Sequence, residues 1–339
     1  MSHRERKDEH LEICLNEDVA SALTTGLERY RLFHSALPQI ALEEVNIASE
    51  FLGHALRAPL LISAMTGGSD VAQDINKRLA TAAQRLGLAM GLGSQRASIE
   101  NPDLRETYQV RDCAPDILLL ANLGAVQLNY GYTEEECCRA VQSVQADALV
   151  LHLNPLQEAL QPGGNTDFRG LLEKIAHVCE TLHCPVLIKE VGWGLSARTA
   201  RRLEEAGVAA LDVGGAGGTS WSRVEQHRSR SAIQARVAGA FDAWGLPTAE
   251  SLIQVRKACP QLPLVASGGI TDGVQAAKCL ALGANLVGIG RPLLGPATES
   301  TQAVMEKLLV IVRQLQTAMF ATGALALAEL GSSHIERRR

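Results

Sequence analysis

Short apolar runs alternate with longer amphipathic stretches over most of the chain. Uninterrupted runs of Val, Leu, Ile and Ala are typical of parallel strands that are buried on both faces. Eight such runs predict strands, at residues 59–64, 88–92, 117–121, 148–153, 185–189, 210–213, 262–266 and 286–289. Eight helices are predicted between and after them, at 72–86, 102–110, 133–144, 168–182, 196–206, 249–258, 272–282 and 299–322. This alternation predicts an α/β fold, a parallel (β/α)8 TIM barrel.

Two parts of the chain depart from this regular pattern. Residues 1–57 are predicted to form an N-terminal extension, with a helix at about 10–22 and two strands at 45–47 and 51–53. The barrel then covers residues 58–339. Its longest interruption, 214–247 after the sixth strand, predicts a long loop, and loops of that length usually act as lids or binding loops.

Glycine follows the last two predicted strands, as Ser267-Gly268-Gly269 and as Gly290-Arg291. Glycine lets backbone N–H groups approach an anion, and a helix N-terminus adds partial positive charge. In an eight-stranded barrel this is where a ligand phosphate usually binds. One glycine pair alone is equally well explained by a tight turn, but two glycine-rich ends together with Arg291 favour a phosphate.

Polar residues follow most of the other predicted strands too. Lys189 ends a buried strand, so its ammonium needs a partner, and it fits either a Schiff-base amine or a donor to a ligand such as a flavin. The loop at 215–219 is a second anion-compatible segment, in which Thr219 is a donor. His152 fits a base or a core histidine, and Glu158 fits a metal ligand or a helix-start acid.

Composition narrows the possible functions. The 339 residues carry 32 Lys and Arg against 37 Asp and Glu, a net charge of −5, which gives no global attraction to nucleic acid or to an anionic membrane. The eight cysteines form no C-x-x-C pair. With no secretory segment and no long apolar run, this predicts a reducing, cytoplasmic setting. Composition alone predicts that the charged N-terminus is a solvated, frayed end.

With these residues laid out, the chain resembles the type 2, FMN-dependent isopentenyl-diphosphate isomerases over nearly its whole length. The most specific motifs are N-P-L-Q-E at 154–158 and G-A-G-G-T-S-W at 215–221. The resemblance also rests on R-K-x-x-H at 6–10, A-M-T-G-G at 64–68, G-S-Q-R at 93–96, A-N-L-G at 121–124, H-x-N-P at 152–155, K-E-V-G at 189–192 and S-G-G at 267–269.

The resemblance implies a barrel that converts isopentenyl diphosphate to dimethylallyl diphosphate, in isoprenoid biosynthesis, with reduced FMN as acid and base. NADPH would reduce the flavin and Mg²⁺ would assist. The residues implied to contact FMN are Ala64, Met65, Thr66, Ser94, Asn122, Lys189, Thr219, Gly268, Gly269, Gly290 and Arg291. Those implied to contact the substrate are Arg6, Lys7, His10, Ser94, Arg96, His152, Asn154 and Gln157. Glu158 would hold Mg²⁺, and His152 and Gln157 would assist the flavin.

A diphosphate ligand changes the interpretation of the N-terminus. A polyanion needs local cations in a chain of net negative charge, and Arg6, Lys7 and Arg96 supply them if the terminus folds over the barrel mouth. The resemblance also implies a homotetramer or homo-octamer.

Two other functions compete with this one. A second candidate is an FMN-dependent oxidoreductase of the hydroxy-acid oxidase or dihydroorotate dehydrogenase type, which would not need Arg6, Lys7 or Glu158. A flavin-storing scaffold barrel is disfavoured by the polar strand ends. A flavin-independent isomerase would need a Cys/Glu pair, and no predicted strand end carries a cysteine.

Overall fold

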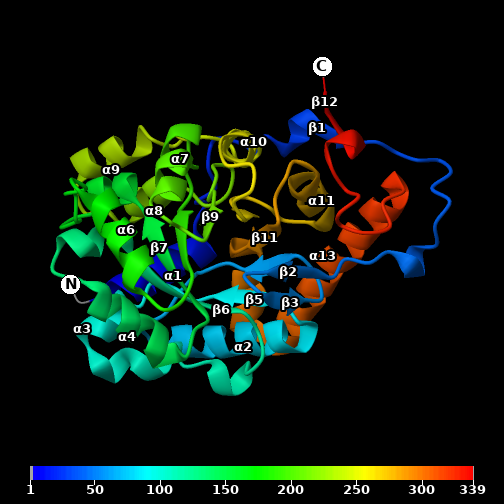
Figure 1. Ribbon diagram of the computed structural model, residues 1–339. Coiled ribbons are helices and arrows are strands. Elements are labelled where there is room, and N and C mark those ends of the chain that lie inside the picture. The colour runs from blue at the N-terminus through cyan, green and yellow to red at the C-terminus, as the bar shows by residue number, and fades with distance from the viewer. Residues whose placement is uncertain (1–2, 339) are drawn as a thin grey trace.

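The computed structural model describes residues 3–338, and a closed barrel of eight parallel strands lies at its centre (Figure 1). The barrel follows the order of the chain, and its last strand pairs with its first. Its strands are β4 (Leu60–Ile62), β5 (Ala89–Gly91), β6 (Leu119–Gly124), β7 (Ala148–Leu153), β8 (Val186–Glu190), β9 (Ala210–Asp212), β10 (Leu264–Ala266) and β11 (Leu286–Ile289). The predicted (β/α)8 barrel is therefore confirmed.

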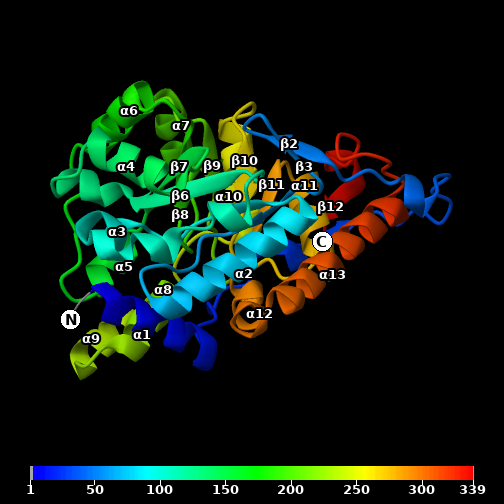
Figure 2. The same ribbon diagram turned by 90° about the horizontal axis from the view of Figure 1, so that it is seen from below.

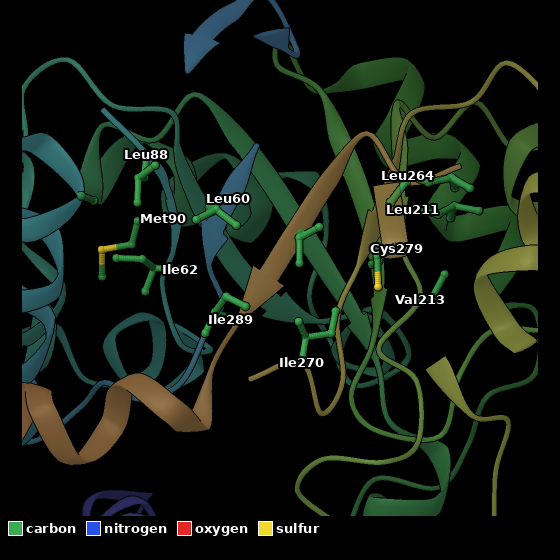
Figure 3. Packing of buried hydrophobic residues seen from close by; sticks show 14 of the residues in the cluster. Leu60, Ile62, Leu88, Met90, Leu211, Val213, Leu264, Ile270, Cys279 and Ile289 are labelled. Atoms are coloured by element: carbon green, nitrogen blue, oxygen red, sulfur yellow. The ribbon is translucent and has the colours of Figure 1, made fainter. Parts of the chain in front are cut away.

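The apolar runs form these strands because both faces of each strand are buried. Successive side chains point to opposite faces of a strand, so Leu60 and Ile62 pack in the large cluster beneath the helices, whereas Leu61 packs in a second cluster. All eight barrel strands contribute to that second cluster, which places it inside the barrel. Figure 3 shows the outer cluster, where Ile62, Met90 and Ile289 lie near one another.

Helices surround the barrel, and each predicted helical segment has an observed counterpart. These are α2 (Asp70–Leu86), η3 (Pro102–Tyr108), α4 (Glu134–Val144), α6 (Leu171–Thr181), α7 (Ala197–Glu205), α10 (Thr248–Ala258), α11 (Gly273–Ala281) and α13 (Thr301–Thr322). Local signals set several boundaries, because Ser69 accepts a hydrogen bond from the Ala72 amide to begin α2 and Thr133 caps α4. The segment at 102–110 is a 3-10 helix that begins with Pro102.

Further short elements complete the described chain. The helical ones are η1 (Leu27–Arg29), η2 (Leu42–Glu44), α3 (Arg96–Glu100), η4 (Arg111–Cys113), η5 (Ala125–Asn129), α5 (Pro155–Leu160), η6 (Arg291–Leu293), α12 (Leu294–Glu299) and η7 (Ser332–His334). Two strands, β1 (Tyr30–Leu32) and β12 (Ile335–Arg337), pair antiparallel and join the extension to the C-terminal segment. The division of the chain at residue 57 stays a prediction.

The extension differs from its predicted structure in two places. Its helix, α1, spans His3–Asn16 rather than 10–22. The strand pair is shifted as well, because the hairpin consists of β2 (Ser49–Phe51) and β3 (His54–Leu56) and turns at residues 52–53, both with positive φ. The shift has a packing reason: Phe51 and Leu56 are buried in the cluster inside the barrel.

The long connection predicted at 214–247 is present between β9 and α10, but it also contains two helices, α8 (Trp221–Arg228) and α9 (Ala232–Gly239). Figure 2 shows α1 and α8 at one end of the molecule, where α1 packs against α8 and α8 packs against α9. Packing between these helices, rather than a clear apolar face on any one of them, decides their structure. None of the described helices is long and apolar enough to cross a membrane.

Candidate active site

The carboxyl ends of the barrel strands and helix α1 enclose one cavity of about 400 Å³. This cavity gathers every residue that the resemblance assigned to a ligand. Its lining includes Arg6, Lys7, His10, Ala64, Met65, Thr66, Ser94, Arg96, Asn122, His152, Asn154, Gln157, Glu158, Lys189, Thr219, Gly268, Gly269, Gly290 and Arg291. The structure thus brings the candidates together, while their individual roles stay predictions.

Two glycine loops meet on one wall of the cavity. A Cβ on Gly218 would lie 2.5 Å from the Gly269 backbone nitrogen, and a Cβ on Gly269 would lie 2.3 Å from the Gly217 carbonyl oxygen. Gly269 also has a φ of +73°, which side chains other than glycine rarely adopt. Only glycine lets these two backbones approach so closely, so the wall presents backbone groups rather than side chains to a ligand.

Lys189 lies at the end of β8 and is held by three acceptors. Its Nζ donates to the Glu190 carbonyl at 2.9 Å and to Ser267 Oγ at 3.1 Å, and it lies 3.1 Å from Asp212 Oδ2. The Lys189 side chain is partly buried, and Asp212 is buried beside it, so the two form an ion pair at the cavity wall. The ion pair supports a donor to a ligand rather than a Schiff-base amine, which must be neutral to react.

His152 is a partly buried, neutral histidine. Its Nδ1 lies 2.8 Å from Asn122 Oδ1. Burial, with the nearby cations of Lys7 and Lys189, lowers the pKa of His152 to about 3. An imidazole of such low basicity is a poor general base near neutral pH, so the geometry favours a hydrogen-bonding role over proton abstraction.

Glu158 is buried in α5 and accepts three hydrogen bonds. Asn154 Nδ2 donates to Oε1 at 3.0 Å, and Gln161 Nε2 and the Asn165 backbone nitrogen donate to Oε2 at 2.6 and 2.5 Å. Glu158 lies in the first turn of α5, as the helix-start explanation requires, so both its explanations stay predictions. Among residues 3–338, no group of three or more His, Cys, Asp or Glu side chains is placed to hold a metal ion. Mg²⁺ here would take its other oxygen ligands from water and substrate phosphates, as it often does.

Helix α1 is ordered over the cavity, so the prediction of a solvated, frayed terminus is wrong. Lys7 Nζ donates to the Ser94 carbonyl at 3.2 Å. His10 Nε2 lies 2.9 Å from Glu225 Oε1, and its ring meets the Trp221 ring edge-on at 5.3 Å. Burial and the neighbouring Arg6 lower the pKa of Lys7 to about 8. Three basic side chains therefore face the cavity from α1, as the resemblance implied and as composition alone did not predict.

The sequence pattern missed two buried acids around the cavity. Asp212 lies within an apolar run on β9 and pairs with Lys189, and Glu225 on α8 pairs with His10. The sequence did carry a signal for each acid. Asp212 is a charged residue within the predicted buried strand 210–213, and Glu225 is one within the predicted loop 214–247. A third acid, Glu190, accepts from the backbone nitrogens of residues 192–194, and burial raises its pKa to about 7.

Comparison with known proteins agrees with this geometry. The family model of FMN-dependent dehydrogenases matches residues 140–337. The chain is 55% identical to an isopentenyl-diphosphate delta-isomerase of Synechococcus sp., over 94% of this chain and 92% of the relative. It is 50% identical to one of Nostoc sp. (97% and 94% covered) and 51% identical to one of Stutzerimonas stutzeri (97% and 96% covered). The chain belongs to the isopentenyl-diphosphate delta-isomerases.

The match to FMN-dependent dehydrogenases fits the flavin-dependent, type 2 branch of the delta-isomerases, so the family resemblance seen in the sequence is confirmed. Solved structures with the same fold are more distant. A flavocytochrome b2 variant with sulfite bound gives a TM-score of 0.70 at 18% identity, over 97% of this chain and 82% of that chain. An (S)-mandelate dehydrogenase gives 0.67 at 18%, over 98% and 99%. At such identity they show the barrel fold alone.

Proposed function

We propose that this delta-isomerase converts isopentenyl diphosphate to dimethylallyl diphosphate with reduced FMN. One observation carries the proposal: a single cavity has a glycine wall with Lys189 on the barrel side and the cations of α1 with Glu158 on the other. The glycine wall and Lys189 suit any FMN barrel. The cations of α1 and Glu158 suit a diphosphate with a divalent cation, and an oxidoreductase acting on a hydroxy acid requires neither.

The cavity fits FMN on two further features. Ser63 Oγ is buried and has no hydrogen-bond partner among the described residues, and the glycine wall accommodates a phosphate. The residues that would hold FMN are Ala64, Met65, Thr66, Ser94, Asn122, Lys189, Thr219, Gly268, Gly269, Gly290 and Arg291. When bound, reduced FMN supplies a proton donor and acceptor and an electron-rich face for positive charge on the substrate.

The chain's own residues bind and shield the substrate in this proposal. Arg6, Lys7 and Arg96 attract the diphosphate, while Asn154 and Gln157 present amides to it. Arg96 is held in place by Glu100 at 2.7 Å and by Asn165 Oδ1 at 2.9 Å. Helix α1 covers the cavity and excludes water, which strengthens these charge interactions. His152, held neutral, orients the substrate rather than taking its proton.

The proposal also includes a metal ion, Mg²⁺, and a reductant for the flavin, NADPH. The buried carboxylate of Glu158, beside the cations that attract the diphosphate, supports Mg²⁺. The isomerisation is redox-neutral, so NADPH would be needed only to reduce the flavin. The sequence carries no second dinucleotide fingerprint, which agrees with occasional rather than stoichiometric use.

An isomerase assay tests the proposed function. Isopentenyl diphosphate with FMN, Mg²⁺ and a small amount of NADPH should give dimethylallyl diphosphate in large molar excess over the NADPH consumed. Product formed in proportion to NADPH, or no product with FMN bound, would contradict the proposal and favour an oxidoreductase.

Replacement of Gly269 by alanine should weaken FMN binding. The new Cβ forces the two loops of the glycine wall apart, and strain of this kind costs about 1–3 kcal/mol, or about ten- to a hundredfold in Kd. Fluorescence titration with FMN measures the effect. Gly295→Ala is the matched control, because no atom lies within 4 Å of its added Cβ. Equal affinities of the two variants would show that the wall does not contact the flavin.

Lys7 should make substrate binding depend on pH. Below its pKa of about 8 the ammonium is protonated and attracts the diphosphate, and this attraction is lost as the pH rises through that value. We expect KM to rise up to about tenfold between about pH 7 and pH 9, because each unit above the pKa leaves tenfold less of the charged form. Lys7→Arg, which stays charged, should keep KM flat over this range. A flat profile in the unaltered enzyme would remove Lys7 from the substrate site.

Assembly and location complete the proposal. Exposed apolar side chains on α13, Leu309 and Val310, support a homotetramer or homo-octamer. A monomeric mass measured by light scattering would contradict the proposed homo-oligomer. All eight cysteines are free thiols, which supports a reducing, cytoplasmic location.

A further inference from the structure

The Lys189 ammonium at the cavity wall lies beside three acceptors of the protein, two by hydrogen bonds and one by an ion pair. They are the Glu190 carbonyl, Ser267 Oγ and Asp212 Oδ2, at 2.9, 3.1 and 3.1 Å. Two of these acceptors are neutral, and one carries a full negative charge. Asp212 therefore decides the net charge that this part of the wall presents to a ligand.

Asp212 itself does not line the cavity and is buried behind it. Its carboxylate is fixed from three sides: Ser267 Oγ donates to Oδ1 at 2.5 Å, the Gly214 nitrogen donates to Oδ1 at 3.1 Å, and Oδ2 faces Lys189. The strand register puts Asp212 directly beside Lys189, because β8 and β9 pair these two residues. Ser267 both accepts from Lys189 and donates to Asp212, so two hydrogen bonds and one ion pair link the three side chains.

The other titratable groups near Lys189 do not replace Asp212. His152, its partner across β7 and β8, is neutral, and its pKa is lowered to about 3 by burial and by the neighbouring cations. The Glu190 side chain turns away to accept from the backbone nitrogens of residues 192–194. The carboxylate that neutralises Lys189 is thus that of Asp212.

We propose that Asp212 is a positioning residue for the flavin site, which holds Lys189 against the cavity and cancels its charge, so that bound FMN meets an ion pair rather than a lone cation. The inference rests on the proposed FMN site. It predicts that Asp212 lowers the preference of the enzyme for reduced over oxidised FMN, because reduction adds negative charge that a lone cation would stabilise more strongly.

The test is the affinity of the full-length protein for oxidised and for reduced FMN, measured without oxygen in neutral buffer, where reduction with uptake of one proton adds one negative charge to the flavin. The ratio of the two dissociation constants gives the preference for reduced FMN. In Asp212→Asn this preference should rise about tenfold, which corresponds to about 30 mV for a two-electron couple. A loss of packing alone would weaken both forms together and leave the ratio unchanged.

Asp147→Asn is the matched control. Asp147 also pairs with a cation, Arg111 at 3.0 Å, but at the opposite end of the barrel, just before β7. The same change of charge there should leave the preference unchanged. Asp212→Glu keeps the charge, so it should weaken both forms of FMN while the preference stays within about twofold of the original enzyme.

If Asp212→Asn does not fold, Asp212→Ser, which removes the same charge from a smaller side chain, carries the test with the same expected rise in the preference for reduced FMN. The inference is overturned if the preference is unchanged or falls in Asp212→Asn, if Asp147→Asn raises it equally, or if Asp212→Glu raises it as well. Failure of the unaltered protein to bind FMN would instead overturn the proposed function, and the inference with it. Normal FMN binding with an unchanged ratio in Asp212→Asn removes only the inference.

Discussion

Replacing Glu158 by glutamine is expected to lower isomerase activity by about a hundredfold or more, the scale of loss when one charged or polar group is removed from a reaction site. The change keeps the shape of the side chain but removes the charge that Mg²⁺ prefers. The fold should tolerate it, because Asn154 Oδ1 is buried with no partner among the described residues. Rotation of the Asn154 amide would let this oxygen accept from the new carboxamide.

The metal dependence of this variant distinguishes two roles of Glu158. A magnesium ligand predicts that excess Mg²⁺ restores part of the activity, while FMN affinity is unchanged. A proton-transfer base predicts no rescue by Mg²⁺ and the loss of one limb of the pH profile. Glu306→Gln, on the exposed surface of α13, controls for the loss of a carboxylate. Full activity of Glu158→Gln at limiting Mg²⁺ would exclude both roles.

Lys189→Met is expected to reduce both stability and FMN binding. It leaves the Asp212 carboxylate buried without a cation, and breaking a buried ion pair in this way costs about 3–5 kcal/mol of the free energy of unfolding. Loss of a charged donor to the flavin should raise the Kd for FMN by about ten- to a hundredfold. Denaturant unfolding and FMN titration measure the two effects separately.

A double variant separates the two effects of this change. Lys189→Met with Asp212→Asn removes both charges, so stability should largely return while FMN affinity stays low. If the double variant regains FMN affinity along with stability, Lys189 has no direct contact with the flavin. If Lys189→Met alone leaves stability unchanged, the Asp212–Lys189 pair is not the buried ion pair described here.

The eight barrel strands were predictable because their signal is local. A parallel strand covered on both faces must be apolar along its whole length, so Leu286–Ile289 or Ala148–Leu153 can be recognised from the run itself. The barrel follows from counting these units. The same logic placed the glycines of 215–218 and 267–269 at strand ends, and the resemblance of their motifs pointed to the family before any contact was known.

Structure outside these strands depended on tertiary contacts. Helices α1 and α8 are rich in polar residues, and the short helix α9 is mostly apolar without a clear apolar face, so the sequence pattern did not predict α8 and α9 and misplaced α1. Arg228 of α8 bonds to Glu9 of α1 at 3.1 Å, a contact between residues 219 positions apart. The β2–β3 hairpin was predicted in the wrong place. Its position depends on the burial of Phe51 and Leu56 in the cluster inside the barrel, and this contact cannot be read from the local sequence pattern.

The sequence by itself determined the fold, the family and the set of residues at the strand ends. Only the tertiary structure decided which of them meet. Lys189 and Asp212 lie 23 positions apart and become partners through the register of β8 and β9. Arg6, Lys7 and His10 reach the cavity because α1 packs against α8. The physical reason is that hydrophobic runs act within a few residues, whereas charge pairing and burial depend on distances that only the closed barrel fixes.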